Sequence, residues 1–173
     1  MQNKYTNKCI MIFLCIVLVL NLVGCKSEDY VYIETNFVIS NLSDEDFQEI
    51  GTTNETNTKE DYKKLKLVLD MKHGKEITNR KVYVPSQDHF KELLNTYDNE
   101  EHYLFGNSTC IDNSSENLAY YEINIIMYTK NLDDNDIKNI FKSEEISISY
   151  LDKNHIQQTK IIKLSDLINI VSF

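Results

Sequence analysis

Apolar and polar residues alternate along most of the chain that follows residue 30. Apolar side chains recur at every second position in residues 31–40, 65–71, 118–129 and 146–150. A period of two places successive side chains on opposite faces of a strand, so each segment is predicted to be a strand with one face against a core. Residues 118–129 are partly apolar on both faces, which predicts a central position in a sheet.

The turn residues between these segments predict how the strands are connected. A glycine-containing turn joins residues 65–71 to a shorter apolar segment at 81–84, and the two are predicted to form a hairpin. A second hairpin is predicted for residues 146–150 and 156–164. Residues 103–105 are predicted to form an edge strand.

Short helices are predicted in the connections, over residues 42–50, 86–97 and 133–142. Each begins with a serine or aspartate that can accept a hydrogen bond from the first helical turn, and Ser43 is the predicted N-cap of the first helix. Ser165 begins a final helical turn.

About seven strands, hairpins and short connecting helices predict a mainly β, antiparallel β-sandwich in which residues 31–173 form one domain. The chain lacks the strand-helix-strand rhythm of a parallel sheet. The alternative is an α+β domain with a single sheet, whose one face is covered by the helices at 86–97 and 133–142.

The first 25 residues have a different pattern. Residues 1–8 carry Lys4 and Lys8 and no acid, and residues 9–20 are apolar without interruption. Twelve helical residues at about 1.5 Å each span roughly 18 Å, well short of the roughly 30 Å hydrocarbon core of a bilayer. A cleaved export signal is therefore favoured over a permanent transmembrane anchor.

The run Leu22-Val23-Gly24-Cys25 that closes this segment resembles the bacterial lipoprotein signal, or lipobox. The resemblance implies that Leu22, Val23 and Gly24 are read by a dedicated signal peptidase and that residues 1–24 are removed. It also implies a diacylglyceryl lipid on the Cys25 thiol and residues 25–30 as a short tether on the extracytoplasmic face of the cell membrane. An ordinary secretory signal and an uncleaved short anchor are the alternatives.

The order of helix, hairpin and terminal Ser-Asp-Leu-Ile in residues 118–170 is similar to that of immunoglobulin-like domains in uncharacterised low-GC Gram-positive lipoproteins. This resemblance implies an immunoglobulin-like β-sandwich. The chain departs from the antibody pattern because it has no tryptophan and no internal disulfide is expected, so only the architecture is carried over.

Charge excludes one class of partner. Two of the 18 basic residues and none of the 27 acidic residues precede Cys25, which leaves residues 25–173 with a net charge of −11. Such acidity argues against nucleic acid as a partner. Half of the remaining basic residues lie between Lys59 and Lys81, and they form either a docking face for an anionic wall polymer or acidic partner, or the solvated side of strands.

Cysteine and histidine offer little chemistry in the sequence. Cys110 is the only thiol left once Cys9, Cys15 and Cys25 are assigned to the leader and the lipid, and it is predicted to be partly buried and inert. The four histidines, without a neighbouring cysteine or carboxylate at zinc spacing, are predicted to lie in turns or on the surface and to bind no metal (His73, His89, His102 and His155).

No catalytic or calcium-binding motif is present. A calcium loop counted from Asp134 has Asn139 where glycine is required, so the acids at 133–136 are better explained by the positive end of the helix that they begin. No Gly-x-Ser-x-Gly motif occurs, and the isolated glycines cannot form a phosphate loop.

The sequence therefore predicts a membrane-anchored surface lipoprotein that acts as a non-enzymatic binding or interaction module of the cell envelope, with no cofactor besides the lipid on Cys25. The expected partners are the membrane, through the lipid anchor, and an envelope protein or wall glycan. The excess of tyrosine has two interpretations: aromatic side chains can stack on sugars or anchor a partner, whereas large β-formers such as Tyr120 and Tyr121 also pack well in strands, and packing is favoured. The alternatives are an envelope-associated hydrolase and a released signal fragment that acts as a peptide signal.

Overall fold

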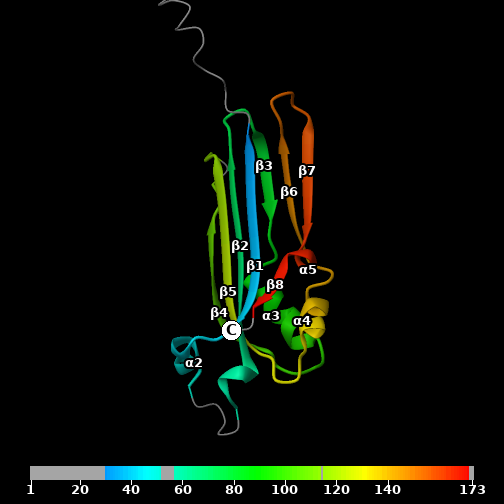
Figure 1. Cartoon of the computed structure of the whole chain (residues 1–173). Coiled ribbons are helices and arrows are strands. Elements are labelled where there is room, and N and C mark those ends of the chain that lie inside the picture. Colours follow the sequence, from blue (N-terminus) through cyan, green and yellow to red (C-terminus); the bar gives the residue numbers. More distant parts are fainter. Residues whose placement is uncertain (1–29, 52–56, 114, 172–173) are drawn as a thin grey trace, which may run out of the picture.

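Two β-sheets are the main feature of the computed structural model, which describes residues 30–51, 57–113 and 115–171 (Figure 1). The five-stranded sheet has the order β4-β5-β2-β1-β8, and the three-stranded sheet has the order β3-β6-β7. The strands are β1 (Val31–Asn41), β2 (Tyr62–His73), β3 (Thr78–Tyr83), β4 (Tyr103–Ile111), β5 (Leu118–Tyr128), β6 (Glu145–Leu151), β7 (Gln157–Lys163) and β8 (Ile168–Val171). The helices are α2 (Asp44–Ile50), the 3-10 turn η1 (Lys59–Asp61), α3 (Gln87–Thr96), α4 (Asp134–Ile140) and α5 (Leu164–Leu167).

The period-two segments form strands as predicted. β5 lies between β4 and β2, which confirms the central position expected from its two partly apolar faces. In β2, every second residue from Leu65 to Met71 is buried. Lys66, which lies within this run, and Lys72, which follows it, are exposed. β6 and β7 form the predicted antiparallel hairpin.

The predicted hairpin between β2 and β3 is wrong. β3 leaves the first sheet and pairs with β6 in the second, where Val82 lies opposite Ile148. The short turn after His73 therefore crosses between the sheets instead of reversing the chain within one sheet. The prediction of a purely antiparallel arrangement is also incomplete, because β8 pairs with β1 in parallel.

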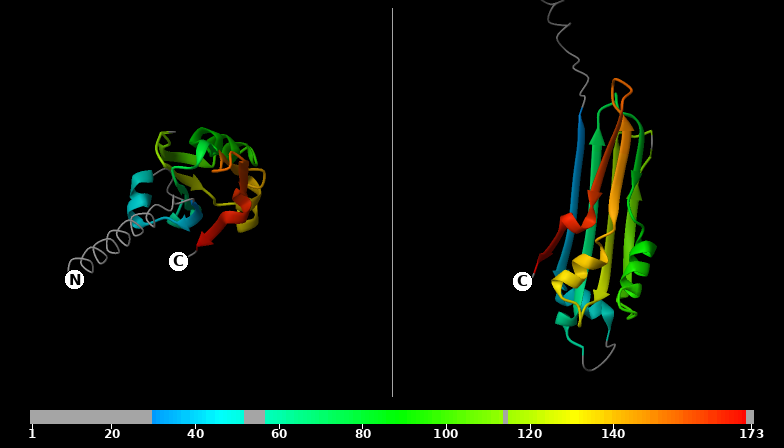
Figure 2. Two further views of the ribbon diagram at one scale, coloured as in Figure 1. Left: turned by 90° about the horizontal axis from the view of Figure 1, so that it is seen from above. Right: turned by 90° about the vertical axis from the view of Figure 1, so that its right-hand side faces the viewer.

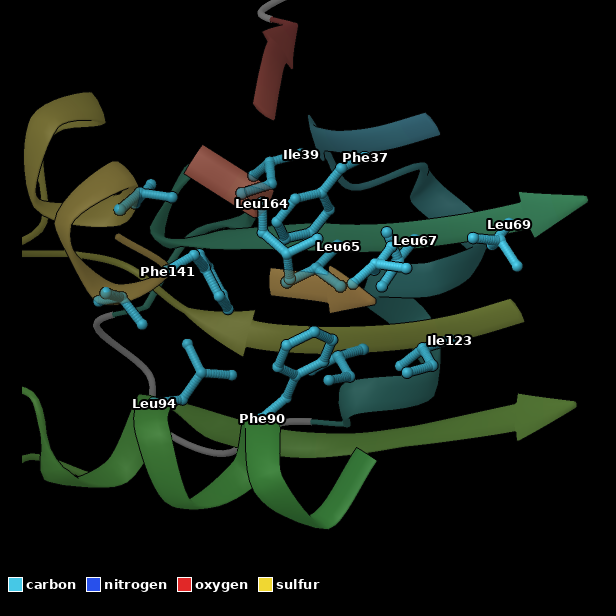
Figure 3. Packing of buried hydrophobic residues seen from close by; sticks show 14 of the residues in the cluster. Phe37, Ile39, Leu65, Leu67, Leu69, Phe90, Leu94, Ile123, Phe141 and Leu164 are labelled. Carbon is cyan, nitrogen blue, oxygen red and sulfur yellow. The ribbon is translucent and has the colours of Figure 1, made fainter. Parts of the chain in front are cut away.

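One apolar core lies between the sheets and is completed by helices (Figure 3). Its fully buried members include Phe37 from β1, Leu67 from β2, Ile148 from β6 and Phe90 from α3. Because both sheets and α3 and α4 contribute to the same cluster, the domain is a two-layer mainly β structure, and the single-sheet alternative is wrong.

The predicted N-caps are confirmed. The side chains of Ser43 and Ser86 each accept a hydrogen bond from the first turn of their helix. Asp133 and Asp136 form a reciprocal capping box, which explains the acids at this position without a calcium ion. α2, α3 and α4 all lie in connections at the same end of the structure, opposite Tyr30 (Figures 1 and 2). We call this the far end.

β4 is an edge strand, but it extends well past the predicted residues 103–105. Gly106 lets it approach β5 closely, since a Cβ atom at this position would lie 2.4 Å from the backbone oxygen of Asn124. Cys110 near the end of β4 is exposed, so the prediction of a partly buried thiol is wrong. All of residues 107–111 in β4 are exposed, and alternation alone could not reveal this.

Candidate functional site

A cleft of about 840 Å³ opens at the far end, between the α2 segment and the ends of β4 and β5. Its apolar walls come from four aromatic rings and two aliphatic side chains, and its polar groups are two carboxylates, an amide and an ammonium. We call it the distal cleft; it is lined by Glu49, Ile50, Asn57, Tyr62, Glu101, Tyr103, Leu104, Phe105, Tyr128 and Lys130.

The aromatic wall of the distal cleft is held by a second, smaller core on the outer face of the five-stranded sheet. Tyr62, Leu42 and Ile126 are buried there. The Tyr62 ring lies 5.3 Å from the Tyr128 ring and 5.9 Å from that of Phe47 on α2. Rings packed in this way keep their orientation when a ligand binds, which lowers the entropic cost of binding.

The distal cleft also contains exposed side chains next to its aromatic wall. Phe105 exposes 37% of its surface, and Lys130 and Glu101 are exposed. The Tyr103 hydroxyl accepts a hydrogen bond from Gln87 at 2.8 Å, which ties the cleft to α3. The cleft therefore combines a packed apolar base with polar donors and acceptors, an arrangement typical of ligand sites.

A smaller hollow of about 380 Å³ adjoins the distal cleft and shares Glu49 and Phe105 with it. It continues over the outer face of the sheet, where Asn124 donates to Glu122 at 2.8 Å and contacts Asn107 at 3.2 Å. The Asn124 hydrogen bond first, then one from the Tyr120 hydroxyl, lowers the pKa of Glu122 to about 2. Glu122 is therefore an ionised acceptor at any physiological pH.

The basic residues of the 59–81 region are largely paired with carboxylates. Lys64 lies 2.8 Å from Asp46, and Lys66 lies 3.3 Å from Glu122. Lys59 and Lys72 pair with Asp44 and Asp70 at 2.5 and 2.9 Å. The solvated side of strands, the second of the two interpretations, describes these lysines better than a free cationic face does.

The prediction that all four histidines lie in turns or on the surface is wrong for two of them. His73 is 5% exposed and His102 is fully buried. The segment between α3 and β4 also brings His102 together with Asp98 and Glu100, so that one ligand atom of each lies within 4.8 Å of the others. The signal in the sequence was the i, i+2, i+4 spacing of these residues, which the prediction passed over.

The contacts of His102 are short. Its Nδ1 lies 2.7 Å from the carbonyl oxygen of Tyr128, and its Nε2 lies 2.9 Å from Oδ1 of Asp98. The backbone N–H of Glu100 also donates to Asp98 Oδ1 at 2.9 Å. This backbone hydrogen bond, followed by the contact with His102, lowers the pKa of Asp98. The trio lies beside the distal cleft, since Tyr128 lines it.

At the end near Tyr30, Arg80 ties the two sheets together. Its side chain is only 3% exposed, and it contacts Asp112, the carbonyls of Asn113 and Glu116, and Nε2 of His73 at 3.0 Å. Asp112 also accepts from Tyr121 at 2.5 Å; burial, and then this hydrogen bond, raises the pKa of Tyr121. Apart from the Nε of Arg80, which is buried without a hydrogen-bond partner, these groups satisfy one another and join the two sheets, so we assign the cluster a structural role.

Two histidine rings among the described residues contact a carboxylate. His89 contacts Glu144 at 2.7 Å and His102 contacts Asp98, but no described serine hydroxyl or thiol forms a hydrogen bond with either ring. Within these same ranges, no helix is long and apolar enough to cross a bilayer.

The predicted lipidation residue, Cys25, and the predicted recognition residues Leu22, Val23 and Gly24 lie outside the described residues. No protein-family model, curated protein or solved structure matches the chain.

Proposed function

We propose that the chain is a surface lipoprotein, anchored through lipid on Cys25, whose domain is a non-enzymatic module that binds wall glycan at the distal cleft. The basic, apolar and lipobox segments of residues 1–25 support the anchor. Two acyl chains give stable membrane attachment at about 0.8 kcal/mol per buried methylene. The folded domain is then free to face outward.

We further propose that the domain is an immunoglobulin-like sandwich with one added strand. The order β4-β5-β2-β1 in one sheet and β3-β6-β7 in the other corresponds to the ABED and CFG sheets of a constant-type immunoglobulin domain. β8 extends the first sheet beside β1. The strand order supports this assignment more strongly than the sequence pattern of residues 118–170.

The distal cleft lies at the end of the domain opposite the proposed membrane tether, which supports binding of a ligand outside the membrane. β1 has 11 residues, and at about 3.3 Å per residue it spans roughly 36 Å from Val31 to the far end. A tether at residues 25–30 holds the opposite end of the domain close to the bilayer. The cleft is then directed away from the membrane, toward the wall.

The chemistry of the cleft favours a sugar chain. The C–H faces of a pyranose ring pack on aromatic rings, and its hydroxyls both donate to carboxylates and accept from amides and ammonium groups. The distal cleft offers both kinds of group in a volume suited to a small oligosaccharide. The net charge of residues 25–173 disfavours a strongly anionic polymer, so the proposed ligand is a neutral stretch of wall glycan.

The combination of packed aromatic rings with polar groups at the far end is the observation that carries this proposal. A hydrolytic role is not favoured, because the histidine-carboxylate pairs of the described residues lack a partnered nucleophile.

Sedimentation with purified wall sacculi from a low-GC Gram-positive bacterium tests the proposal. The full chain, extracted in mild detergent, is expected to sediment with the sacculi and to be released by soluble wall oligosaccharides. Phe105→Ser removes an exposed ring of the cleft and is expected to weaken binding at least about 10-fold, as for an interface anchor.

Ile161→Ser is the matched control, because Ile161 is 57% exposed on β7 and does not line the cleft. Binding that is absent, or that both variants weaken equally, contradicts the proposal. Crosslinking to an envelope protein that is lost only in Phe105→Ser, without sedimentation, assigns the cleft to a protein partner instead.

A further inference from the structure

The hydrogen-bond geometry of Asp98, Glu100 and His102, which we call the trio, requires a cation between two acceptor atoms. A carbonyl oxygen can only accept, so the Tyr128 carbonyl fixes the proton of the buried ring on Nδ1 of His102. In the neutral ring, Nε2 then carries a lone pair, and this lone pair faces Asp98 Oδ1 at 2.9 Å. Two acceptors face each other at hydrogen-bond distance, so a positive charge must lie between them.

We propose that Asp98, Glu100 and His102 bind a divalent transition-metal ion, with Zn²⁺ the preferred ion. A histidine whose Nδ1–H donates to a backbone carbonyl while Nε2 faces outward has the orientation common among metal-binding histidines. Imidazole and carboxylate ligands together suit Zn²⁺, which also outranks the lighter divalent ions Mn²⁺ and Fe²⁺ in affinity for such sites. This inference does not depend on the proposed function.

A metal ion accounts for the geometry better than a proton on Nε2 does. A protonated ring satisfies one carboxylate, but an oxygen of a second carboxylate, that of Glu100, also lies within 4.8 Å of the ligand atoms of Asp98 and His102. Around a tetrahedral ion with bonds of about 2.0–2.1 Å, two ligand atoms lie about 3.4 Å apart, so His102 Nε2 and Asp98 Oδ1, which lie 2.9 Å apart here, have to separate by about 0.5 Å to admit Zn²⁺.

The backbone prepares the site. Asn99 adopts a left-handed conformation, with φ of 67°, which turns the chain between the two carboxylates. The Glu100 N–H holds Asp98 in place, and the backbone N–H of Tyr128 donates to the His102 carbonyl at 2.8 Å. Asp98 and Glu100 are exposed, so water can complete the coordination. A bound ion would fasten the α3–β4 connection to β5 beside the distal cleft.

Calorimetric titration of the untagged full chain in detergent with ZnCl₂, after dialysis against a chelator, tests the site. One equivalent of Zn²⁺ is expected to bind. Glu100→Gln and Asp98→Asn keep side-chain shape but remove a charged ligand, and each is expected to weaken binding at least about 10-fold.

Glu92→Gln is the matched control, since Glu92 is an exposed carboxylate of α3 that belongs neither to the trio nor to the lining of the distal cleft. It is expected to bind Zn²⁺ as the unaltered chain does. Absence of binding in the unaltered chain, or equal loss in all three variants, overturns the proposal.

Nitrogen NMR of the histidine rings distinguishes metal binding from a purely structural role of His102, because only metal binding changes the Nε2 chemical shift when Zn²⁺ is added. Zn²⁺ is expected to shift the Nε2 resonance of His102 while its Nδ1 remains protonated, and Glu100→Gln is expected to remove the shift at the same Zn²⁺ concentration. A His102 Nε2 that keeps its own proton when Zn²⁺ is present shows that the cation is a proton only, and overturns the proposal.

Discussion

Phe141 tests whether the far-end connections are packed into the core. Its ring, just after α4, is fully buried and meets Phe37 of β1 edge-on at 5.1 Å and Phe90 of α3 at 5.5 Å. The three rings join a strand of the first sheet to two helix-bearing connections. Phe141→Ala removes the ring from this junction without introducing a polar group.

The expected cost follows from the burial. Truncation of a fully buried phenylalanine to alanine destabilises by about 3–5 kcal/mol, because apolar burial is lost and a cavity remains. Typical domains are stable by only about 5–15 kcal/mol, so the variant keeps a fold with much of its stability removed. The melting temperature is expected to fall by roughly 10–20 °C for a domain of this size.

Urea unfolding followed by circular dichroism measures this loss. Phe105→Ala is the matched control, since the exposed Phe105 is expected to change stability by no more than about 0.5 kcal/mol. Combining Phe141→Ala with Phe90→Ala should give a coupling of about 0.5–3 kcal/mol, because the rings touch. A loss below about 1 kcal/mol for Phe141→Ala refutes the packing of the α4 connection described above.

Three further predictions follow from individual positions. Because the pKa of Glu122 lies near 2, below the ordinary 4.5, its ionised form stabilises the fold above about pH 4.5, and this is lost as the pH falls toward 2. Glu122→Gln should therefore cost on the order of 1 kcal/mol at pH 7 for this partly exposed group and almost nothing near pH 2; a pH-independent difference in urea titrations contradicts this. Gly106→Ala should destabilise by about 1–3 kcal/mol because its Cβ meets the backbone of Asn124, whereas Ser108→Ala on the same strand should be nearly neutral in thermal melts, and equal melting of the two variants speaks against the close approach. The exposed thiol of Cys110 should react with a thiol reagent without denaturant, and reaction only after unfolding would show that β4 is covered.

Alternation and capping predicted the local elements because both are properties of neighbouring residues. The sequence predicted the strand segments, the N-caps at Ser43 and Ser86, and the start of a helix at Asp133. The destination of β3 was not, since the same short turn after His73 can close a hairpin or cross to another sheet. That choice depends on which strand pairs with the edge of β6, a contact between distant segments.

The candidate site in the folded domain was not predicted from the sequence. The excess of tyrosine was compatible with packing or with binding, and the contact between Tyr62 and Tyr128 depends on the register of β2 and β5. The trio at Asp98, Glu100 and His102 had a readable spacing, yet its convergence depends on a left-handed Asn99 and on the distant Tyr128 carbonyl. The spacing of the three residues can be read from the local sequence, whereas their convergence depends on the folded structure.

Intact mass measurement of the protein extracted from native membranes tests the anchored binding module most directly. The account predicts a chain that begins at Cys25 and carries a diacylglyceryl group on its sulfur, and a Cys25→Ala variant that stays unprocessed or is shed into the medium. An unmodified Cys25 thiol, or a mature chain that begins at another residue, contradicts the proposed attachment and with it the outward orientation of the distal cleft.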